Sequence, residues 1–174
     1  SKALANGPAA RARRMPEARQ RQPNEHMIFQ LVVGCIMILA TTVIHGFAAF
    51  TGVRMLRSHY SKRRGPPSTL HDTYTVALLV LWLFLAKVVE IWLWAGLFIG
   101  LGALETLEEA LYFSTVTFST LGYGDIVLNT RWRLLASFEA ANGLFLFGWS
   151  TALIFAVVQR LDVIGDYKNR PKQD

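Results

Sequence analysis

The chain has 174 residues, of which 52% are hydrophobic, and its 18 lysines and arginines against 12 aspartates and glutamates give a net charge of +6. This apolar fraction is more than a single soluble core of this length needs, so the composition indicates a membrane protein rather than a soluble domain. The basic residues gather beside the apolar runs, as the positive-inside rule predicts, and therefore do not indicate a nucleic-acid partner. Cys35 is the only cysteine, which excludes an intrachain disulfide and a zinc site built on cysteines.

The N-terminal part divides into a polar and an apolar segment. Residues 1–26 are rich in alanine, arginine, proline and glutamine and lack apolar periodicity, which predicts a flexible basic tail. Part of this tail is foreign to the native protein if translation starts at Met15 or Met27. Residues 27–53 are almost continuously apolar, and at about 1.5 Å per residue they can cross a hydrocarbon core of roughly 30 Å. They predict a first transmembrane helix.

Residues 54–72 predict a basic cytoplasmic loop. Arg54, Arg57 and Arg63 are spaced by multiples of three, as in a voltage-sensing helix, but their neighbours are polar and they lie outside the apolar run. A juxtamembrane loop is therefore the favoured interpretation. The next apolar run, residues 73–101, predicts a second transmembrane helix.

Residues 106–119 predict a short separate helix. Thr106 can cap its free amides, and Glu109 can reach back to the amide of the capping residue, which makes a capping box. The segment is about 20 Å long as a helix, too short to cross the bilayer, so it must stop halfway or lie flat. Residues 132–158 predict the last transmembrane helix, and residues 161–174 a cytoplasmic tail.

The sequence STLGYGD, residues 119–125, lies between the short helix and the last span. Non-helical backbone at membrane depth is tolerated only where it is buried in protein or lines a water-filled path. Gly122 and Gly124 can adopt backbone conformations barred to other residues, so successive carbonyls can turn to the same side. The side chains of Leu121 and Tyr123 then point away from that side. A row of carbonyl oxygens of this kind suits a dehydrated cation.

The motif from Thr120 to Asp125, T-L-G-Y-G-D, resembles the selectivity filter of potassium channels. The order of an outer helix, pore helix, filter and inner helix resembles a bacterial potassium channel with two transmembrane helices and a pore loop, here preceded by an additional helix. The resemblance covers residues 73–160. It implies an all-α membrane protein of the bacterial inner membrane that passes K⁺ without an organic cofactor. Because one chain carries one filter copy, it also implies a homotetramer with fourfold symmetry.

Carried onto this sequence, the resemblance assigns roles to individual positions. The carbonyls of four residues would bind K⁺, with one threonine hydroxyl completing the innermost site: Thr120, Leu121, Gly122 and Tyr123. Four residues would support the filter: Gly124, Asp125, Tyr112 and Thr117. Two glycines would act as a hinge and a second flexible or close-packing point: Gly143 and Gly148. Three residues would line the central cavity: Leu144, Phe147 and Thr151.

The chain also departs from the family pattern. Leu121 replaces the usual valine, and Phe113 stands where an indole often donates a hydrogen bond to the filter tyrosine. Val116 stands where some members carry a glutamate that braces the filter aspartate, so slow inactivation is expected to differ from theirs. Tyr112 could still reach Asp125.

Ionisable residues inside the predicted spans include His45, Lys87, Glu90 and Glu139. A charge at helix centre costs on the order of 2.5–3.5 kcal/mol on insertion scales, so these groups should be paired, protonated or turned inward. Lys87 and Glu90 are three residues apart and can face one another. Two interpretations remain open: a pH-sensitive brace behind the filter with Glu139 against Lys87, or hydrogen bonds that only set helix packing. His45 is favoured as a polar contact between helices.

The expected topology contains one conflict. A filter that faces outward puts the basic loop in the cytoplasm and the N-terminus outside, yet the tail carries five arginines that translocate poorly. A start at Met15 or Met27 weakens the conflict; otherwise the first helix is interfacial. The expected function is passive K⁺ conduction by a non-enzyme, with gating left open. The alternatives are a poorly selective cation channel, a subunit of an ion-uptake transporter, or a membrane enzyme built on Glu90, Glu139 and His45.

Overall fold

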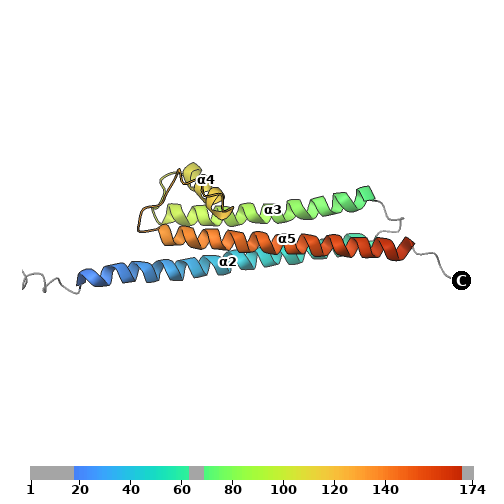
Figure 1. Ribbon diagram of the computed structural model, residues 1–174, viewed down its shortest axis with the longest axis horizontal. Helices are drawn as coiled ribbons and strands as arrows, with labels where there is room; N and C mark the ends of the chain where they lie inside the picture. The colour runs from blue at the N-terminus through green and yellow to red at the C-terminus, as the bar shows by residue number, and fades with distance from the viewer. Residues whose placement is uncertain (1–17, 63–68, 170–174) are drawn as a thin grey trace, which may run out of the picture.

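The computed structural model describes the backbone of residues 18–62 and 69–169 and the side chains of residues 25–59 and 70–160. Four helices form the described part of the chain: α2 (Ala18–Lys62), α3 (Thr69–Gly100), α4 (Leu107–Phe118) and α5 (Arg133–Asn169). No strand occurs within these ranges. The long helices α2, α3 and α5 run side by side, and the short α4 lies at the end of the bundle where α5 begins (Figure 1). The fold is therefore all-helical, as the sequence predicts.

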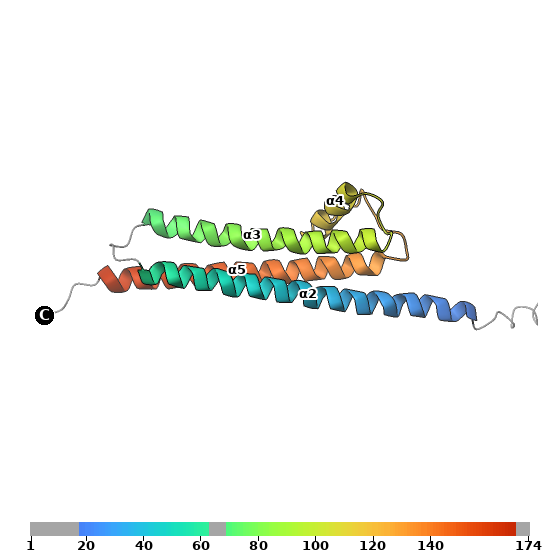
Figure 2. The ribbon, with the colours of Figure 1, turned by 180° about the vertical axis from the view of Figure 1, so that it is seen from behind.

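Within the described ranges, three helices are long and apolar enough to cross a membrane by length and composition: Glu25–His59, Leu70–Gly100 and Arg133–Arg160. They contain nearly all of the three predicted spans. Seen from behind, the same three helices lie lengthwise against one another, and the N-terminal end of α2 projects beyond the start of α5 (Figure 2). The helices present many large exposed apolar side chains, including Phe47 and Phe50, which suits a surface that faces lipid.

The long helices extend beyond the predicted boundaries. Helix α2 continues to Lys62, so most of the segment predicted as a loop from residue 54 is helical where it is described. Its start at Ala18 also places residues 18–26, predicted as a flexible tail, in the helix, and α5 runs on to Asn169 in the predicted C-terminal tail. Helical hydrogen bonding needs no apolar environment, and neither glycine nor proline interrupts residues 54–62. Residues 1–17 of the tail and 63–68 of the loop lie outside the described residues.

The start of α4 shows one of the two bonds of the predicted capping box, the one to the Thr106 hydroxyl. Thr106 has extended backbone angles, φ −117° and ψ 151°, and its hydroxyl accepts a hydrogen bond of 3.2 Å from the amide of Glu109. This bond satisfies one of the amides that the first helical turn leaves free. The helix ends at Phe118, after only 12 residues, and the 119–125 segment follows it directly.

The buried core has two parts. Around α4, aromatic and aliphatic side chains of α3, α4 and α5 pack together, with Trp94, Phe98 and Phe118 fully buried. Toward the other end, α2, α3 and α5 meet through the smaller cluster of Ala49, Leu79, Leu83 and Val157. The first cluster fixes the position of α4 and therefore of the loop that follows it.

Helix α2 is packed closely against both other long helices. A Cβ at Gly34 would lie 2.9 Å from the ring of Phe138 in α5, so only glycine permits this approach. The indole nitrogen of Trp82 in α3 donates a 2.9 Å hydrogen bond to the Ala48 carbonyl. Intramembrane polar contacts of this type add specificity to helix packing. Helix α2 is thus joined to both α3 and α5.

Candidate functional site

The loop of residues 119–125 has an unusual backbone. Thr120, Gly122 and Gly124 have positive φ angles of 61°, 55° and 75°, so left-handed residues recur at every second position. In an ordinary strand successive carbonyls point to opposite sides, whereas alternating left-handed residues let them face the same side. Thr120 is the only residue other than glycine with positive φ in the described chain. Such a conformation costs a non-glycine residue about 1–3 kcal/mol and is found preferentially at functional sites.

The amides of this loop are tied to the end of α4. Thr120 N donates to Thr117 O at 2.9 Å, and Leu121 N and Gly122 N donate to Val116 O at 3.0 and 3.3 Å. These bonds satisfy carbonyls that the last helical turn leaves free. They also give Thr117 its contact with the loop, through its backbone carbonyl.

The carbonyls of the loop have no such partners. Within the described residues, no backbone amide donates to the carbonyls of residues 120–124. The amides of Thr120, Leu121 and Gly122 are bonded on the α4 side, so this stretch presents oxygens without internal hydrogen bonds. Unpaired backbone carbonyls at membrane depth are expensive unless water or a cation meets them. The arrangement can therefore coordinate a cation through oxygen atoms alone.

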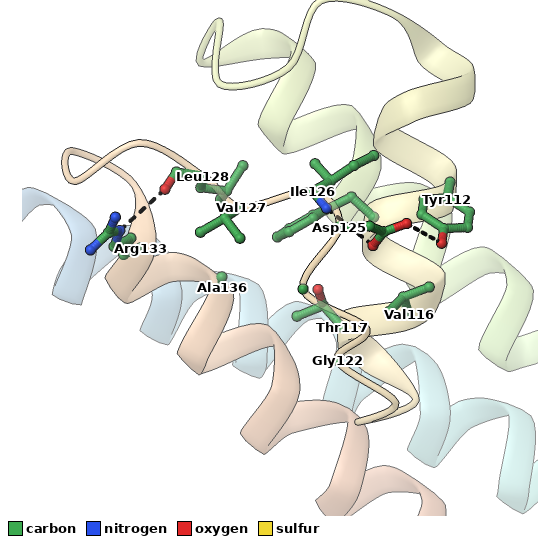
Figure 3. A pocket seen from close by; sticks show the side chains of 12 residues that line it. Tyr112, Val116, Thr117, Gly122, Asp125, Ile126, Val127, Leu128, Arg133 and Ala136 are labelled. Carbon is green, nitrogen blue, oxygen red and sulfur yellow. Dashed lines mark hydrogen bonds between the residues drawn. The ribbon is translucent and has the colours of Figure 1, made fainter.

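The outer limb of the loop, which contains Asp125, is held by a hydrogen bond between side chains. Tyr112 donates from its hydroxyl to Asp125 Oδ2 at 2.5 Å, and Asp125 Oδ1 accepts from the Ile126 amide at 3.0 Å (Figure 3). The sequence-based expectation that Tyr112 could reach Asp125 is therefore confirmed. A cavity of about 230 Å³ lies between α4, this limb and the start of α5, with Val116 among its lining residues. Apart from Asp125, the residues that line this cavity include no carboxylate, and the Tyr112 hydroxyl is the side-chain donor to Asp125.

The Tyr112–Asp125 bond shifts the pKa of both groups. Hydrogen bonding from Tyr112 lowers the pKa of Asp125 below its ordinary value, and the same bond raises the pKa of Tyr112. A carboxylate with a lowered pKa in the folded state contributes stability above its ordinary titration range. That contribution is lost as the pH falls through the folded-state pKa. Both groups are exposed, so water weakens the effect.

Replacing Tyr112 by phenylalanine is expected to raise the pKa of Asp125 toward its ordinary value, because the ring stays but the hydroxyl donor is lost. The carbon-13 shift of the Asp125 carboxyl, followed against pH, measures this change. Tyr74→Phe on α3 is the control, since it removes another exposed hydroxyl far from the loop along the chain. An unchanged Asp125 titration in Tyr112→Phe would contradict the assignment.

The side chains of the loop find little support in their own chain. Leu121 is 60% exposed and Tyr123 69% exposed, although both are large and apolar enough to favour burial. Both side chains project from the loop and pack little against the rest of the chain. A second protein surface beside the loop would bury them.

The predicted cavity residues lie on a common exposed stretch of α5. Leu144 is 64% exposed and Phe147 38% exposed, and Thr151 is also exposed. Phe147 approaches the ring of Phe118, with centroids 6.0 Å apart, so this face begins where α4 ends. The positions agree with the assigned role, which stays a prediction.

The two glycines of α5 differ in their surroundings. A Cβ at Gly143 would overlap the backbone carbonyl oxygen of Phe118 and lie 2.7 Å from its carbonyl carbon. A Cβ at Gly148 would meet no atom of the chain within 4 Å. Helix α5 is continuous through both positions. Gly143 therefore permits the close approach of α5 to the end of α4, while its role as a hinge stays a prediction.

The buried ionisable residues form a cluster that the sequence located only in part. Lys87 Nζ lies 3.0 Å from Glu90 Oε2, which confirms that the two residues face one another. His45 Nδ1 lies 3.0 Å from both Lys87 Nζ and Glu90 Oε1, and His45 Nε2 lies 3.1 Å from Ser150 Oγ. All four side chains are buried. His45 is thus a polar contact between helices, and Ser150 is the member that the sequence-based reasoning missed.

Of the two interpretations that the sequence left open, the pairing of Glu139 with Lys87 is wrong, because Lys87 bonds to Glu90 and His45 instead. Lys87 lies at the level of Ser150, and Glu139 precedes Ser150 by 11 residues, about 16 Å along a helix. Glu139 is fully buried and faces Ser114 of α4, but neither side chain reaches hydrogen-bonding geometry with a described residue.

A second polar link between α2 and α5 was also not foreseen. Asn142 Nδ2 donates a 2.7 Å hydrogen bond to Thr41 Oγ1, and both residues are buried. The sequence signal was a polar residue in each of two apolar runs, but 101 positions separate them and no local pattern pairs them. Among the described residues, no group of three or more histidine, cysteine, aspartate or glutamate side chains could hold a metal ion.

Comparison with known proteins supports the interpretation of this region. Searches of curated proteins and of solved structures found no match to the chain. The family model described as "Ion channel" matches residues 77–160, which include most of α3, all of α4, the 119–125 loop and the membrane-crossing part of α5. Over residues 77–160 the chain is therefore similar to ion channel domains, and its three long apolar helices indicate an integral membrane protein.

Proposed function

We propose that the protein is a potassium-selective channel that passes K⁺ passively across the membrane through the backbone carbonyls of Thr120, Leu121, Gly122 and Tyr123. The observation that carries this proposal is the alternation of left-handed residues in a loop whose carbonyls lack internal partners. Carbonyl oxygens that replace the hydration shell of K⁺ are the basis of selectivity in potassium channels. Thr120 would add its hydroxyl at the inner end.

One loop can surround an ion on one side only. The proposal therefore requires four copies of the chain around one axis, as closed symmetric oligomers provide. The exposure of Leu121 and Tyr123 supports this assembly, because a neighbouring copy would bury both side chains. The exposed face of α5 with Leu144 and Phe147 would then enclose the central cavity.

The direction of α4 favours a cation in that cavity. The carboxyl end of a helix carries a partial negative charge, and α4 ends at Phe118 next to Phe147 of the cavity face. Permeation would need no organic cofactor and no covalent chemistry. The bacterial inner membrane is the proposed location, with membrane lipid as the surroundings of the tetramer.

Gly122→Ala is expected to abolish K⁺ flux or its selectivity over Na⁺, because the residue has φ of 55° and a methyl group disfavours that conformation. Flux into liposomes under a K⁺ or Na⁺ gradient measures the effect. Gly102→Ala is the matched control. Gly102 has φ of 63° and open space around it, but it lies in the turn after α3 rather than in the loop.

The outcomes separate the candidate functions. Loss in Gly122→Ala with normal selectivity in Gly102→Ala supports carbonyl selection by the loop. Equal K⁺ and Na⁺ flux in the unmodified protein would favour a poorly selective cation channel. Unchanged selective flux in Gly122→Ala would overturn the assignment of the filter.

A further inference from the structure

One buried cluster lies outside the proposed filter and joins three helices near the C-terminal end of α4. It consists of His45, Lys87, Glu90 and Ser150. His45 comes from α2, Lys87 and Glu90 from α3, and Ser150 from α5. The Lys87 ammonium lies 5.9 Å from the ring centroid of Phe118 and 5.4 Å from that of Phe147. A change of charge here would act directly beside the end of α4.

The hydrogen bonds of His45 cannot all form in one protonation state. Ser150 Oγ can donate its only hydrogen to the Leu146 carbonyl at 3.0 Å, and in that arrangement His45 Nε2 carries a hydrogen and donates it to Ser150. In a neutral ring, His45 Nδ1 is then an acceptor. It can accept from Lys87 at 3.0 Å, but it faces Glu90 Oε1, also at 3.0 Å, with a lone pair.

One additional proton reverses this choice. A protonated ring carries hydrogen on both nitrogens, so Nδ1 donates to Glu90 and can no longer accept from Lys87. The ammonium of Lys87 then faces a cationic ring at 3.0 Å. Like charges at that distance in a buried site repel, and Lys87 is driven toward the faces of Phe118 and Phe147, which attract a cation.

We propose that His45 is a proton-binding site through which α2 controls the pore, and that binding of a proton lowers K⁺ flux. The cluster is neutral when Lys87 and Glu90 are charged and His45 is not, and it carries +1 once His45 is protonated. That positive charge lies beside the C-terminal end of α4, where a K⁺ ion in the cavity would sit, and it repels the ion. The direction of the effect rests on the proposed K⁺ conduction.

The groups around His45 leave few other candidates for this role. Lys87 and Glu90 face it from α3 and Ser150 from α5, and the ring of Trp149 meets it edge-on with centroids 5.4 Å apart. Helix α4 contributes Phe118 near Lys87, while its two carboxylates, Glu108 and Glu109, lie in its first turn at the other end. Histidine is the side chain whose ordinary titration lies closest to neutral pH, so this group is the natural proton receptor of the set.

The chain has four histidines, and the test uses the variant H26Q/H59Q/H71Q, in which His45 is the single histidine that remains. K⁺ flux in liposomes is compared at about pH 5 and pH 8, and nitrogen-15 shifts of the His45 ring are followed over the same range. We expect the ring to change protonation and flux to fall roughly three- to tenfold at the lower pH. His45→Gln in the complete chain is expected to conduct at both pH values with no such fall.

Each outcome decides the proposal. A ring that keeps one protonation state throughout the range, or a pH response that survives in His45→Gln, overturns it. A response that disappears in the H26Q/H59Q/H71Q variant would assign the effect to another histidine and also overturns it. If His45→Gln fails to assemble, the single-histidine protein still gives both readouts. A protein that passes no K⁺ at any pH contradicts the proposed function, while the ring titration still tests proton binding alone.

Discussion

Gly143→Ala is expected to destabilise the folded protein by about 3 kcal/mol or more, at the upper end of the cost of overpacking a core. The added methyl group would overlap the carbonyl oxygen of Phe118, and both partners are backbone or fixed to it, so no flexible side chain can move aside. Either α5 or the end of α4 must shift. Because the 119–125 loop starts directly after Phe118, the shift would also displace the proposed filter.

Gly148→Ala is the matched control for this prediction. It makes the same change five residues further along α5, where a Cβ meets no atom within 4 Å. Alanine has a better helix propensity than glycine by about 1 kcal/mol, so this variant is expected to be as stable as the parent or slightly more stable. Thermal unfolding of the purified proteins in detergent compares the three. Equal unfolding temperatures for the two variants would contradict the close packing of α5 on α4 and favour a pure hinge at Gly143.

Glu90→Gln is expected to destabilise the protein by about 3 kcal/mol, because it leaves the Lys87 ammonium buried beside an uncharged side chain. A cationic group that lacks its carboxylate in a water-free environment is more costly than the absence of the pair. The double variant Lys87→Met/Glu90→Gln removes both charges. It should therefore recover most of the stability lost in the single variant.

Unfolding of the two single variants and the double variant completes the cycle and gives the coupling between Lys87 and Glu90. Glu105→Gln is the control, since it neutralises an exposed carboxylate in the turn before α4 and should change stability by no more than about 0.5 kcal/mol. Additive effects of Lys87→Met and Glu90→Gln would show that the pair contributes nothing as a pair. That result would also remove the basis for charge control by His45.

The parts of the fold that depend on local chemistry could be predicted from the sequence. Length and continuous apolarity located the three long helices, and Thr106 with Glu109 located the start of α4. The helix ends were less well predicted, because α2 continues past the apolar run to Lys62. Composition marks where lipid ends but not where helical hydrogen bonding ends; the sequence signal for the latter was Gly65, Pro66 and Pro67, which follow Lys62 closely along the chain.

The contacts between distant residues could be predicted only in part. Lys87 and Glu90 are neighbours on one helix, so periodicity paired them correctly, whereas His45 and Ser150 are 105 residues apart and belong to different helices. Such contacts depend on how far one helix is shifted along its axis relative to another, and no single segment encodes that shift. For this reason the sequence could not exclude a pairing of Glu139 with Lys87. Gly143 shows the same limit, because a helical glycine can permit bending or close packing, and only the position of Phe118 shows that Gly143 permits close packing.

The reversal potential of the purified protein in a planar bilayer, with K⁺ on one side and Na⁺ on the other, measures the selectivity of the pore. Carbonyls of Thr120, Leu121, Gly122 and Tyr123 that replace the hydration shell of K⁺ would make the membrane permeable to K⁺ and not to Na⁺. The expected potential therefore follows the K⁺ gradient and keeps its sign when chloride is replaced by a larger anion. A current that reverses at zero voltage with these two cations at equal concentration would contradict potassium selectivity.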